Sequence, residues 1–211
     1  MTTTFIESPF STRVEYEAWV ALPAAEKTAA LEAARQKAAP TTLSAVAPAC
    51  PVLPETLERR DGSTVGHEAL SGKMVVLFFS SEWCPACKSF IPILKTLYED
   101  GKENGKELEV VYVSSDNDAA QKARYMQQHH GDWLSVPWHD KAARDLLKTT
   151  YGCYAGKEAP HFPGVRRRAG IPSIVIISPT GEECVHMDCD PPSEITRKGD
   201  AILDEWVAYR W

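Results

Sequence analysis

The stretch Met74-Val-Val-Leu-Phe-Phe-Ser-Ser-Glu-Trp-Cys-Pro-Ala-Cys-Lys88 sets the architecture of this chain. Residues 74–80 form a largely apolar run of strand length, which is typical of a central strand covered on both faces. The run leads into Cys84-Pro85-Ala86-Cys87, and apolar residues then recur at helical spacing to about residue 104. A second buried strand is predicted at 108–114. Because strand, helix and strand follow within about forty residues, we expect a βαβ unit with parallel strands.

Further elements are predicted on both sides of this unit. Asp61-Gly62 is a hairpin turn signal between two strand-like segments, at 55–60 and 63–69. The later segments are predicted as helices at about 117–130, 141–151 and 199–211, and as strands at 174–178 and 183–188. This order predicts an α/β fold in which a central mixed β-sheet is flanked by helices.

The first fifty residues differ in composition from the rest of the chain. From Pro23 to about Ala39 they are mostly Ala, Glu, Lys and Gln, which favour helix but leave little apolar surface to bury. Prolines then recur at positions 40, 48, 51 and 54, which is typical of an extended linker. We therefore predict a helical N-terminal extension and Pro-rich linker at 1–50 and a folded domain at 51–211.

Charge and composition argue against several classes of function. The formal net charge of −6 disfavours general nucleic-acid binding, which depends on basic surface. No apolar stretch approaches the roughly 18 residues of a membrane span. The N-terminal sequence does not resemble a secretory signal, so we expect a cytoplasmic location. There are 6 cysteines but no second Cys-x-x-Cys pair, so no metal site is expected.

The close cysteine pair carries the predicted chemistry. Cys84 stands between strand and helix, so unpaired N–H groups at the helix N-terminus favour its thiolate form. Pro85 suits the first helical position because its missing N–H has no partner there anyway. Cys87 lies one turn further on, within bonding distance but shielded. We therefore expect Cys84 to attack a disulfide and Cys87 to resolve the mixed disulfide.

These residues also resemble a known family. Trp83-Cys84-Pro85-Ala86-Cys87-Lys88, with Gly170-Ile171-Pro172-Ser173 downstream, is similar to the thioredoxin superfamily, and the closer resemblance is to tryparedoxins and nucleoredoxins. Phe79-Ser80-Ser81-Glu82-Trp83-Cys84 is similar to their Phe-Ser-Ala-Ser-Trp-Cys. Trp133-Leu134-Ser135-Val136-Pro137-Trp138 resembles their Pro-Trp-Leu-Ala-(Val/Leu)-Pro-Phe. The resemblance covers about residues 55 to 210 and implies a thioredoxin-like fold.

The resemblance implies a protein-disulfide reductase of tryparedoxin type. Such a protein passes electrons from a low-molecular-weight thiol, trypanothione or glutathione, to protein disulfides such as those of peroxiredoxin-type peroxidases. Its redox group is the Cys84–Cys87 pair, with no other cofactor. The alternative is a nucleoredoxin-type interaction module that is regulated by oxidation and turns over little. The residues expected to contact substrate are Trp83, Pro85, Ala86, Asp116, Ile171 and Pro172.

The sequence leaves open the geometry and the roles of three features around the cysteine pair. The isomer of the Ile171-Pro172 bond is undetermined, although a cis bond would place the Ile171 backbone beside Cys84. Asp116 could contact substrate or merely cap the next helix. Phe78 stands where bacterial-type thioredoxins carry a buried Asp, so the base for Cys87 is expected to be water or Glu82.

An insertion at 153–168 has no counterpart in the family pattern. It ends in Arg166-Arg167-Arg168, which either face solvent or steer an acidic partner. Cys50 in the linker and Cys153 in the insertion receive no role.

Overall fold

The computed structural model describes residues 50–189 and 194–211. The predicted extension at residues 1–50 lies outside the described residues except for Cys50, so the proposed domain boundary stays a prediction. Cys50 itself is not an exposed linker thiol, because it is buried and its backbone N–H donates to Nδ1 of His67 at 2.9 Å. The folded domain therefore includes at least this residue of the predicted linker.

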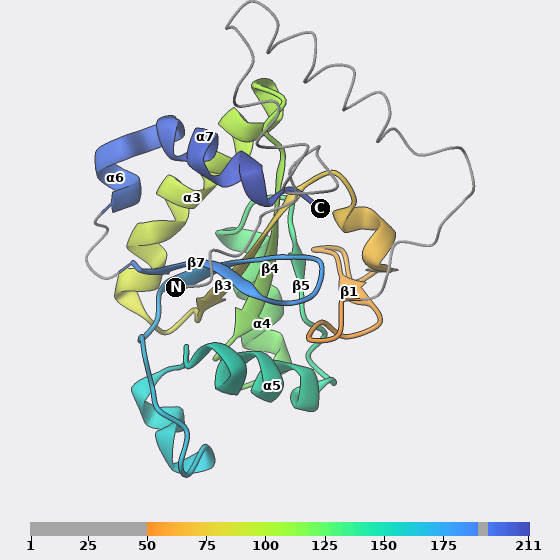
Figure 1. The fold of residues 1–211 in the computed structure, drawn as a ribbon. Coiled ribbons are helices and arrows are strands. Elements are labelled where there is room, and N and C mark those ends of the chain that lie inside the picture. Colours follow the sequence, from red (N-terminus) through yellow and green to blue (C-terminus); the bar gives the residue numbers. More distant parts are fainter. Residues whose placement is uncertain (1–49, 190–193) are drawn as a thin grey trace, which may run out of the picture. The chain divides into compact units, whose positions relative to one another are not determined.

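A mixed sheet of seven strands forms the centre of the described domain, in the order β2-β1-β5-β4-β3-β6-β7 (Figure 1). The long strand β3 pairs in parallel with β4 on one side and antiparallel with β6 on the other. This arrangement confirms the predicted βαβ unit and the central place of residues 74–80. The strands are β1 (Leu57–Glu58), β2 (Thr64–Val65), β3 (Met74–Ser80), β4 (Leu108–Ser114), β5 (Leu134–Ser135), β6 (Ser173–Ile177) and β7 (Glu183–Asp188).

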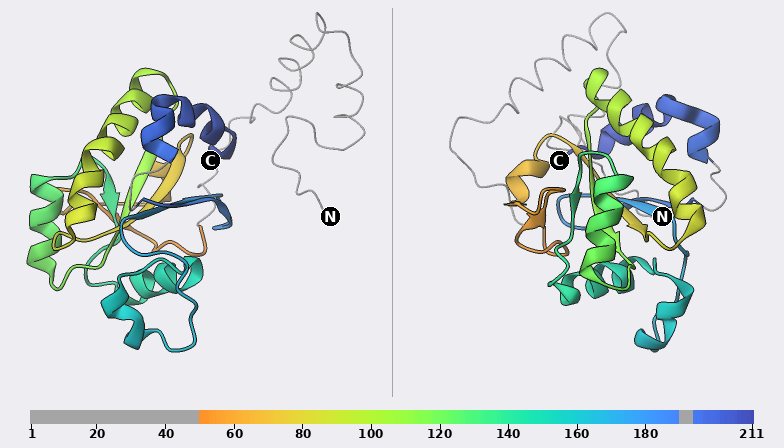
Figure 2. Two further views of the ribbon diagram at one scale, coloured as in Figure 1. Left: turned by 90° about the vertical axis from the view of Figure 1, so that its left-hand side faces the viewer. Right: turned by 180° about the vertical axis from the view of Figure 1, so that it is seen from behind.

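Helices cover both faces of the sheet (Figure 2). Apolar side chains of α3, α4 and α7 pack on one face, whereas those of α5 pack on the other. The expected α/β fold, with a mixed sheet flanked by helices, is therefore confirmed. The α-helices are α3 (Pro85–Glu103), α4 (Ala119–Gln128), α5 (Lys141–Tyr151), α6 (Glu194–Lys198) and α7 (Ile202–Trp206). The short 3₁₀ helices are η1 (His67–Leu70), η2 (Gly156–His161), η3 (Gly199–Ala201) and η4 (Val207–Tyr209).

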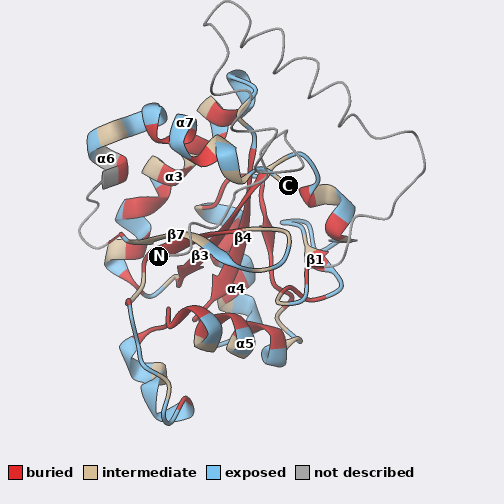
Figure 3. Ribbon diagram, in the orientation of Figure 1, coloured by how far each residue is buried: buried red, intermediate tan, exposed pale blue. Residues whose placement is uncertain are grey.

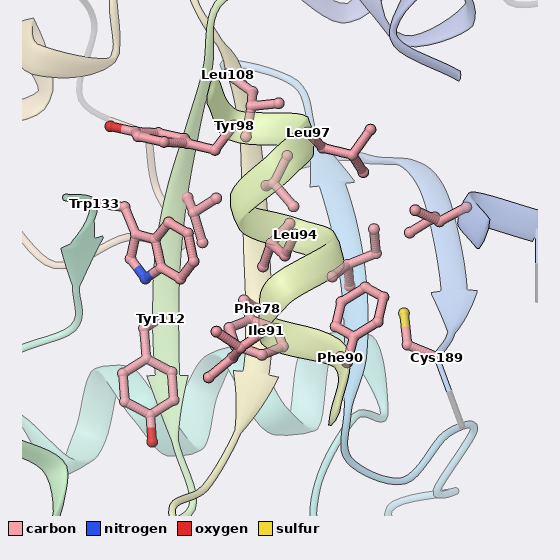
Figure 4. Packing of buried hydrophobic residues seen from close by; sticks show 14 of the residues in the cluster. Phe78, Phe90, Ile91, Leu94, Leu97, Tyr98, Leu108, Tyr112, Trp133 and Cys189 are labelled. Atoms are coloured by element: carbon pink, nitrogen blue, oxygen red, sulfur yellow. The ribbon is translucent and has the colours of Figure 1, made fainter. Parts of the chain in front are cut away.

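The core explains why β3 lacks polar alternation. Its residues are buried along the whole strand (Figure 3). Successive side chains enter apolar layers on opposite faces of the sheet. On the α3 face, the Phe78 ring packs against Phe90 with ring centroids 5.9 Å apart. Leu94 follows one turn after Phe90 in the same layer (Figure 4). This packing holds the N-terminal end of α3 against the end of β3.

Two predicted elements differ from the structure. The segment predicted as a strand at 63–69 leaves the sheet after Val65 and becomes η1, because the ring of His67 turns inward and bonds the carbonyl of Pro54 at 2.7 Å. The helix predicted at 199–211 is broken into η3, α7 and η4, and α6 precedes it. Gly199 has φ +58, a left-handed conformation that ends α6 and that glycine adopts without steric cost.

Candidate active site

Cys84 lies at the junction of β3 and α3, as predicted. It is the N-cap of α3, with extended φ and ψ of −90 and 114, and Pro85 occupies the first helical turn. The Cys84 sulfur accepts a hydrogen bond from the backbone N–H of Cys87 at 3.2 Å. An N–H of the first turn has no partner within the helix, so the sulfur serves as the cap.

The two thiols differ in accessibility. Both are free, but Cys84 retains 6% of its accessible surface and Cys87 retains 0%. Burial raises the pKa of the Cys87 thiol well above its usual value, and hydrogen bonding to the Cys84 sulfur raises it further. A hydrogen bond with Ser80 offsets part of this rise. A substrate sulfur can therefore reach Cys84 first, which agrees with the predicted order of attack.

Ile171 contacts Cys84 from the loop that precedes β6. The Cys84 thiol points to the Ile171 carbonyl at 3.7 Å, and the Ile171-Pro172 peptide bond is cis. Ile171 is half-buried, whereas Pro172 is buried and its carbonyl accepts a hydrogen bond from the Cys189 N–H at 3.0 Å. The structure therefore brings Ile171 next to Cys84, while buried Pro172 anchors the loop that carries Ile171 to the end of β7 through Cys189.

Trp83 provides an aromatic surface next to Cys84. Its side chain is 36% exposed, and its indole N–H donates to the carbonyl of Ser115 at 3.0 Å. Pro85 is exposed and Ala86 is half-buried on the same turn. Of the residues predicted to contact substrate, Trp83, Pro85, Ala86 and Ile171 are thus at least partly accessible around the nucleophile.

Comparison with known proteins agrees with this geometry. Residues 72–183 match the family model described as thioredoxin-like. The chain belongs to the thioredoxin-like family. Proteins of this family are generally redox-active oxidoreductases. The expected thioredoxin-like fold is thereby confirmed.

Relatives of this thioredoxin-like chain include nucleoredoxins. Nucleoredoxin of Mus musculus is 31% identical over 131 residues, which are 62% of this chain and 26% of that protein. Nucleoredoxin-like protein 1 of Mus musculus is 30% identical over 142 residues, covering 65% of this chain and 57% of that protein. The chain therefore spans only about a quarter of the length of the nucleoredoxins that it matches.

Solved structures give the same fold. Thioredoxin from Wuchereria bancrofti superposes with a TM-score of 0.55 and 29% identity, covering 76% of this chain and 99% of that chain. Tryparedoxin from Trypanosoma brucei has a TM-score of 0.54 at 24% identity, covering 74% of this chain and 93% of that chain, and so supports the fold alone. These relatives confirm the resemblance to thioredoxins, tryparedoxins and nucleoredoxins. None of the helices within 50–189 and 194–211 has the length and apolarity to span a membrane.

Asp116 has a different role in this thioredoxin-like domain from the predicted one. Its carboxylate is buried and accepts four hydrogen bonds, from the hydroxyls of Ser81, Tyr112 and Ser114 and from the Glu82 N–H, at 2.8, 2.5, 2.8 and 2.8 Å. With both oxygens occupied, the side chain ties the end of β4 to the loop before Cys84. The geometry does not support the predicted substrate contact. Nor does Asp116 cap α4, since Asp118 does so by accepting from Gln121 N at 2.7 Å.

Glu82 is not suited to act as the base for Cys87. Arg124 binds its carboxylate through two hydrogen bonds, at 3.0 and 2.7 Å, and these lower the pKa of Glu82. A hydroxyl pair lies at Cys87 instead: Ser80 bonds Cys87, and Ser80 Oγ lies 3.1 Å from Tyr125 Oη. The earlier alternative of Glu82 is therefore wrong, and Ser80 with Tyr125 forms the polar lining behind the buried thiol.

The insertion at 153–168 is partly ordered as η2. Glu158 holds it in place, since its carboxylate accepts from Lys148 at 2.6 Å, from the Ser115 hydroxyl at 2.7 Å and from the Ala155 N–H at 3.0 Å. Lys157 then lies over the Trp83 ring, 3.9 Å from its centroid. Sequence reasoning missed both Glu158 and Lys157, because no local pattern marks a contact that only the fold creates.

The three arginines of the insertion have different environments. Arg168 forms two hydrogen bonds with Glu183, at 2.5 and 2.8 Å, so its charge is compensated. Arg167 donates through Nε to the Tyr154 carbonyl at 2.9 Å. Arg166 is exposed. All three side chains are exposed, as the solvent-facing alternative expected, and Arg168 is paired with Glu183, which leaves Arg166 and Arg167 for the steering alternative.

The thiol of Cys153 is buried in the same region. Its sulfur lies 3.1 Å from Nε2 of His186, and burial raises its pKa to about 11. Cys153 is fully covered by protein, so it is an inner thiol of the insertion.

Proposed function

We propose that this thioredoxin-like domain is a thiol–disulfide oxidoreductase that passes electrons from a low-molecular-weight thiol to protein disulfides. The observation that supports it is the unequal placement of the two thiols at the start of α3. Cys84 keeps accessible surface beside Ile171, whereas Cys87 is fully buried behind it. A pair of this kind suits sequential attack and resolution.

The reaction proceeds in two exchange steps. The Cys84 thiolate attacks one sulfur of the substrate disulfide, a new S–S bond forms to that sulfur, and the other substrate sulfur leaves as a thiol after taking up a proton. Cys87 then loses its proton and attacks the Cys84 sulfur, which releases the second substrate thiol and leaves a Cys84–Cys87 disulfide. The substrate gains two electrons, and the protein loses them.

A low-molecular-weight thiol completes the cycle. Two thiol groups of trypanothione or glutathione become one disulfide as they reduce the Cys84–Cys87 bond. We propose peroxiredoxin-type peroxidases as one class of protein substrate, contacting Trp83, Pro85, Ala86 and Ile171. We also propose the cytoplasm as the location, since thiols are kept reduced there.

A second candidate function is a redox-regulated interaction module with little turnover. The small exposed fraction of Cys84, 6%, favours it, because a large folded substrate reaches such a sulfur slowly. In that case oxidation of the cysteine pair changes the surface around Trp83 and alters partner binding.

Reduction of insulin disulfides separates the two functions. The full chain is incubated with insulin and excess trypanothione, glutathione or dithiothreitol, with Cys84→Ser as the inactive control. Many turnovers per protein molecule support the oxidoreductase. A single stoichiometric exchange by the parent chain, with none by Cys84→Ser, supports the interaction module. Comparison of the three reductants identifies the donor class.

A further inference from the structure

The insertion at 153–168 places two cations on the loops that neighbour Cys84. Lys157 lies on Trp83, which directly precedes Cys84, and Arg167 lies on the loop that carries Ile171. Within the described ranges, neither cation forms an ion pair with a carboxylate. Their charges are therefore available to a ligand.

The Lys157 side chain is held in a fixed position by two contacts. Its ammonium lies 3.9 Å from the Trp83 ring centroid and donates to Asn117 Oδ1 at 2.7 Å. The neighbouring Glu158 anchors η2 through three hydrogen bonds. A cation fixed on the exposed aromatic ring next to the nucleophile is positioned to meet a substrate that approaches Cys84.

A cavity of about 640 Å³ opens beside Lys157. Of its three lining carboxylates, Glu158 pairs with Lys148 and Asp145 pairs with Lys141, while Asp116 is buried and accepts four hydrogen bonds from uncharged groups. Its cations also include Arg144, whose guanidinium donates to main-chain carbonyls rather than to a carboxylate. The cavity thus has surplus positive charge, which suits a carboxylate group.

Arg167 places a further positive charge on the loop that carries Ile171. A Cβ atom on Gly170 would lie 2.7 Å from Arg167 Nη2, so the guanidinium rests directly on the backbone before Ile171. Arg167 and Ile171 line a second cavity of about 300 Å³, which Asp188 also lines. The Ile171 carbonyl is 3.7 Å from the Cys84 sulfur, so Ile171 connects this cavity to the surroundings of the nucleophile.

We propose that the insertion determines substrate specificity, with Lys157 and Arg167 binding carboxylates near the sulfur that Cys84 attacks. The substrate class is a disulfide flanked by acidic groups, either acidic side chains of a protein or the carboxylates of a glutathione-type peptide. This inference rests on the proposed oxidoreductase function. Attraction of this kind acts mainly on association and weakens with salt.

The test uses disulfide-linked peptides that differ only in the residues beside each cysteine, Glu in one and Gln in the other. The double variant Lys157→Gln/Arg167→Gln is compared with Lys102→Gln/Arg210→Gln, which removes the same charge. Lys102 lies in the last turn of α3, roughly 25 Å along the helix from Cys84, and Arg210 donates to the nearby Gly105 carbonyl. Melting temperatures verify that both variants fold.

The double variant is expected to lose roughly five- to tenfold in kcat/KM on the Glu peptide at low salt, and less than about twofold on the Gln peptide. The loss shrinks at about 0.5 M salt, and the control pair matches the parent. Lys157→Glu/Arg167→Glu should instead favour a Lys-flanked peptide. Equal losses on the Glu and Gln peptides, or none on either, overturn the inference.

Oxidised glutathione forms a further arm of the experiment. A loss on glutathione comparable to that on the Glu peptide shows that small thiols are recognised in the same way, whereas a loss confined to the peptide assigns the cations to protein substrates. Failure of the parent chain to reduce any of these disulfides, while the chain is folded, refutes the proposed oxidoreductase function instead. The two failures are thus distinguished by the activity of the parent.

Discussion

Replacement of Asp116 by Asn tests how the loop before Cys84 is held. The carboxylate accepts four hydrogen bonds in a buried position, and two of its donors belong to Ser81 and Glu82, directly before Trp83. Asn keeps the shape but removes the charge and replaces one accepting oxygen by a donating NH₂ group. The hydroxyl donors can rotate, whereas the Glu82 N–H cannot.

The expected cost follows from these bonds. A hydrogen bond to a charged group contributes about 1.5–3 kcal/mol and a neutral one about 0.5–1.5 kcal/mol, so each weakened bond costs about 1–1.5 kcal/mol and the four together about 4–6 kcal/mol in the free energy of unfolding. For a chain of this size, that corresponds to a fall of roughly 8–24 °C in melting temperature. Loosening of the loop also displaces the Trp83 ring, so kcat/KM falls.

Thermal unfolding and steady-state reduction of insulin are measured on the same samples. Asp118→Asn is the matched control, because it makes the same change two residues away at the N-cap of α4, where Asn caps as well as Asp. The control should stay within about 0.5 kcal/mol of the parent. An Asp116→Asn protein with an unchanged melting temperature and a raised KM would refute the structural role and restore the predicted substrate contact.

Three further predictions concern the interior. Burial lowers the pKa of His130 well below its usual value, so the folded chain keeps this side chain neutral while the unfolded chain binds a proton below about pH 6.5. The free energy of unfolding should therefore fall with decreasing pH by up to about 1.4 kcal/mol per pH unit. Urea unfolding at pH 7 and pH 5 should show a smaller fall for His130→Asn than for the parent chain. Ser80→Ala removes a hydroxyl that bonds Cys87, so the pKa of Cys87 should rise further and the mixed disulfide should persist severalfold longer in quenched-flow assays; an unchanged lifetime contradicts this role. Leu94→Ala leaves a cavity in the α3 layer and should cost about 2–5 kcal/mol in urea unfolding, and a cost below about 1 kcal/mol would show that the layer is loosely packed.

Local patterns were sufficient to predict the centre of the fold. The bounds of β3 and β4 follow from apolar runs, and α3 from helical spacing that begins directly after Cys84. These signals are strong because both faces of the strands and one face of the helix are buried. The same juxtaposition places Cys84 at a helix N-terminus, so the position of the candidate nucleophile could also be predicted.

Contacts between distant segments could not be predicted. The donors to Asp116 come partly from a loop 34 and 35 residues earlier, and Lys157 reaches Trp83 only through the fold. The isomer of the Ile171-Pro172 bond was likewise open, since cis and trans differ by only about 0.5–1 kcal/mol before tertiary structure acts. In each case the deciding energy lies in tertiary packing rather than in local sequence.

The order of attack by the two cysteines is tested most directly by covalent trapping. Cys87→Ser and Cys84→Ser variants are each reduced, mixed with an oxidised peptide substrate, quenched with acid and analysed by peptide-mapping mass spectrometry. Cys87→Ser should accumulate a mixed disulfide at Cys84, because Cys84 is the more exposed of the two thiols and the resolving thiol is absent. Cys84→Ser should accumulate none, since Cys87 is fully buried and burial raises the pKa of its thiol. Equal trapping by both variants, or a mixed disulfide mapped to Cys87, would contradict the account.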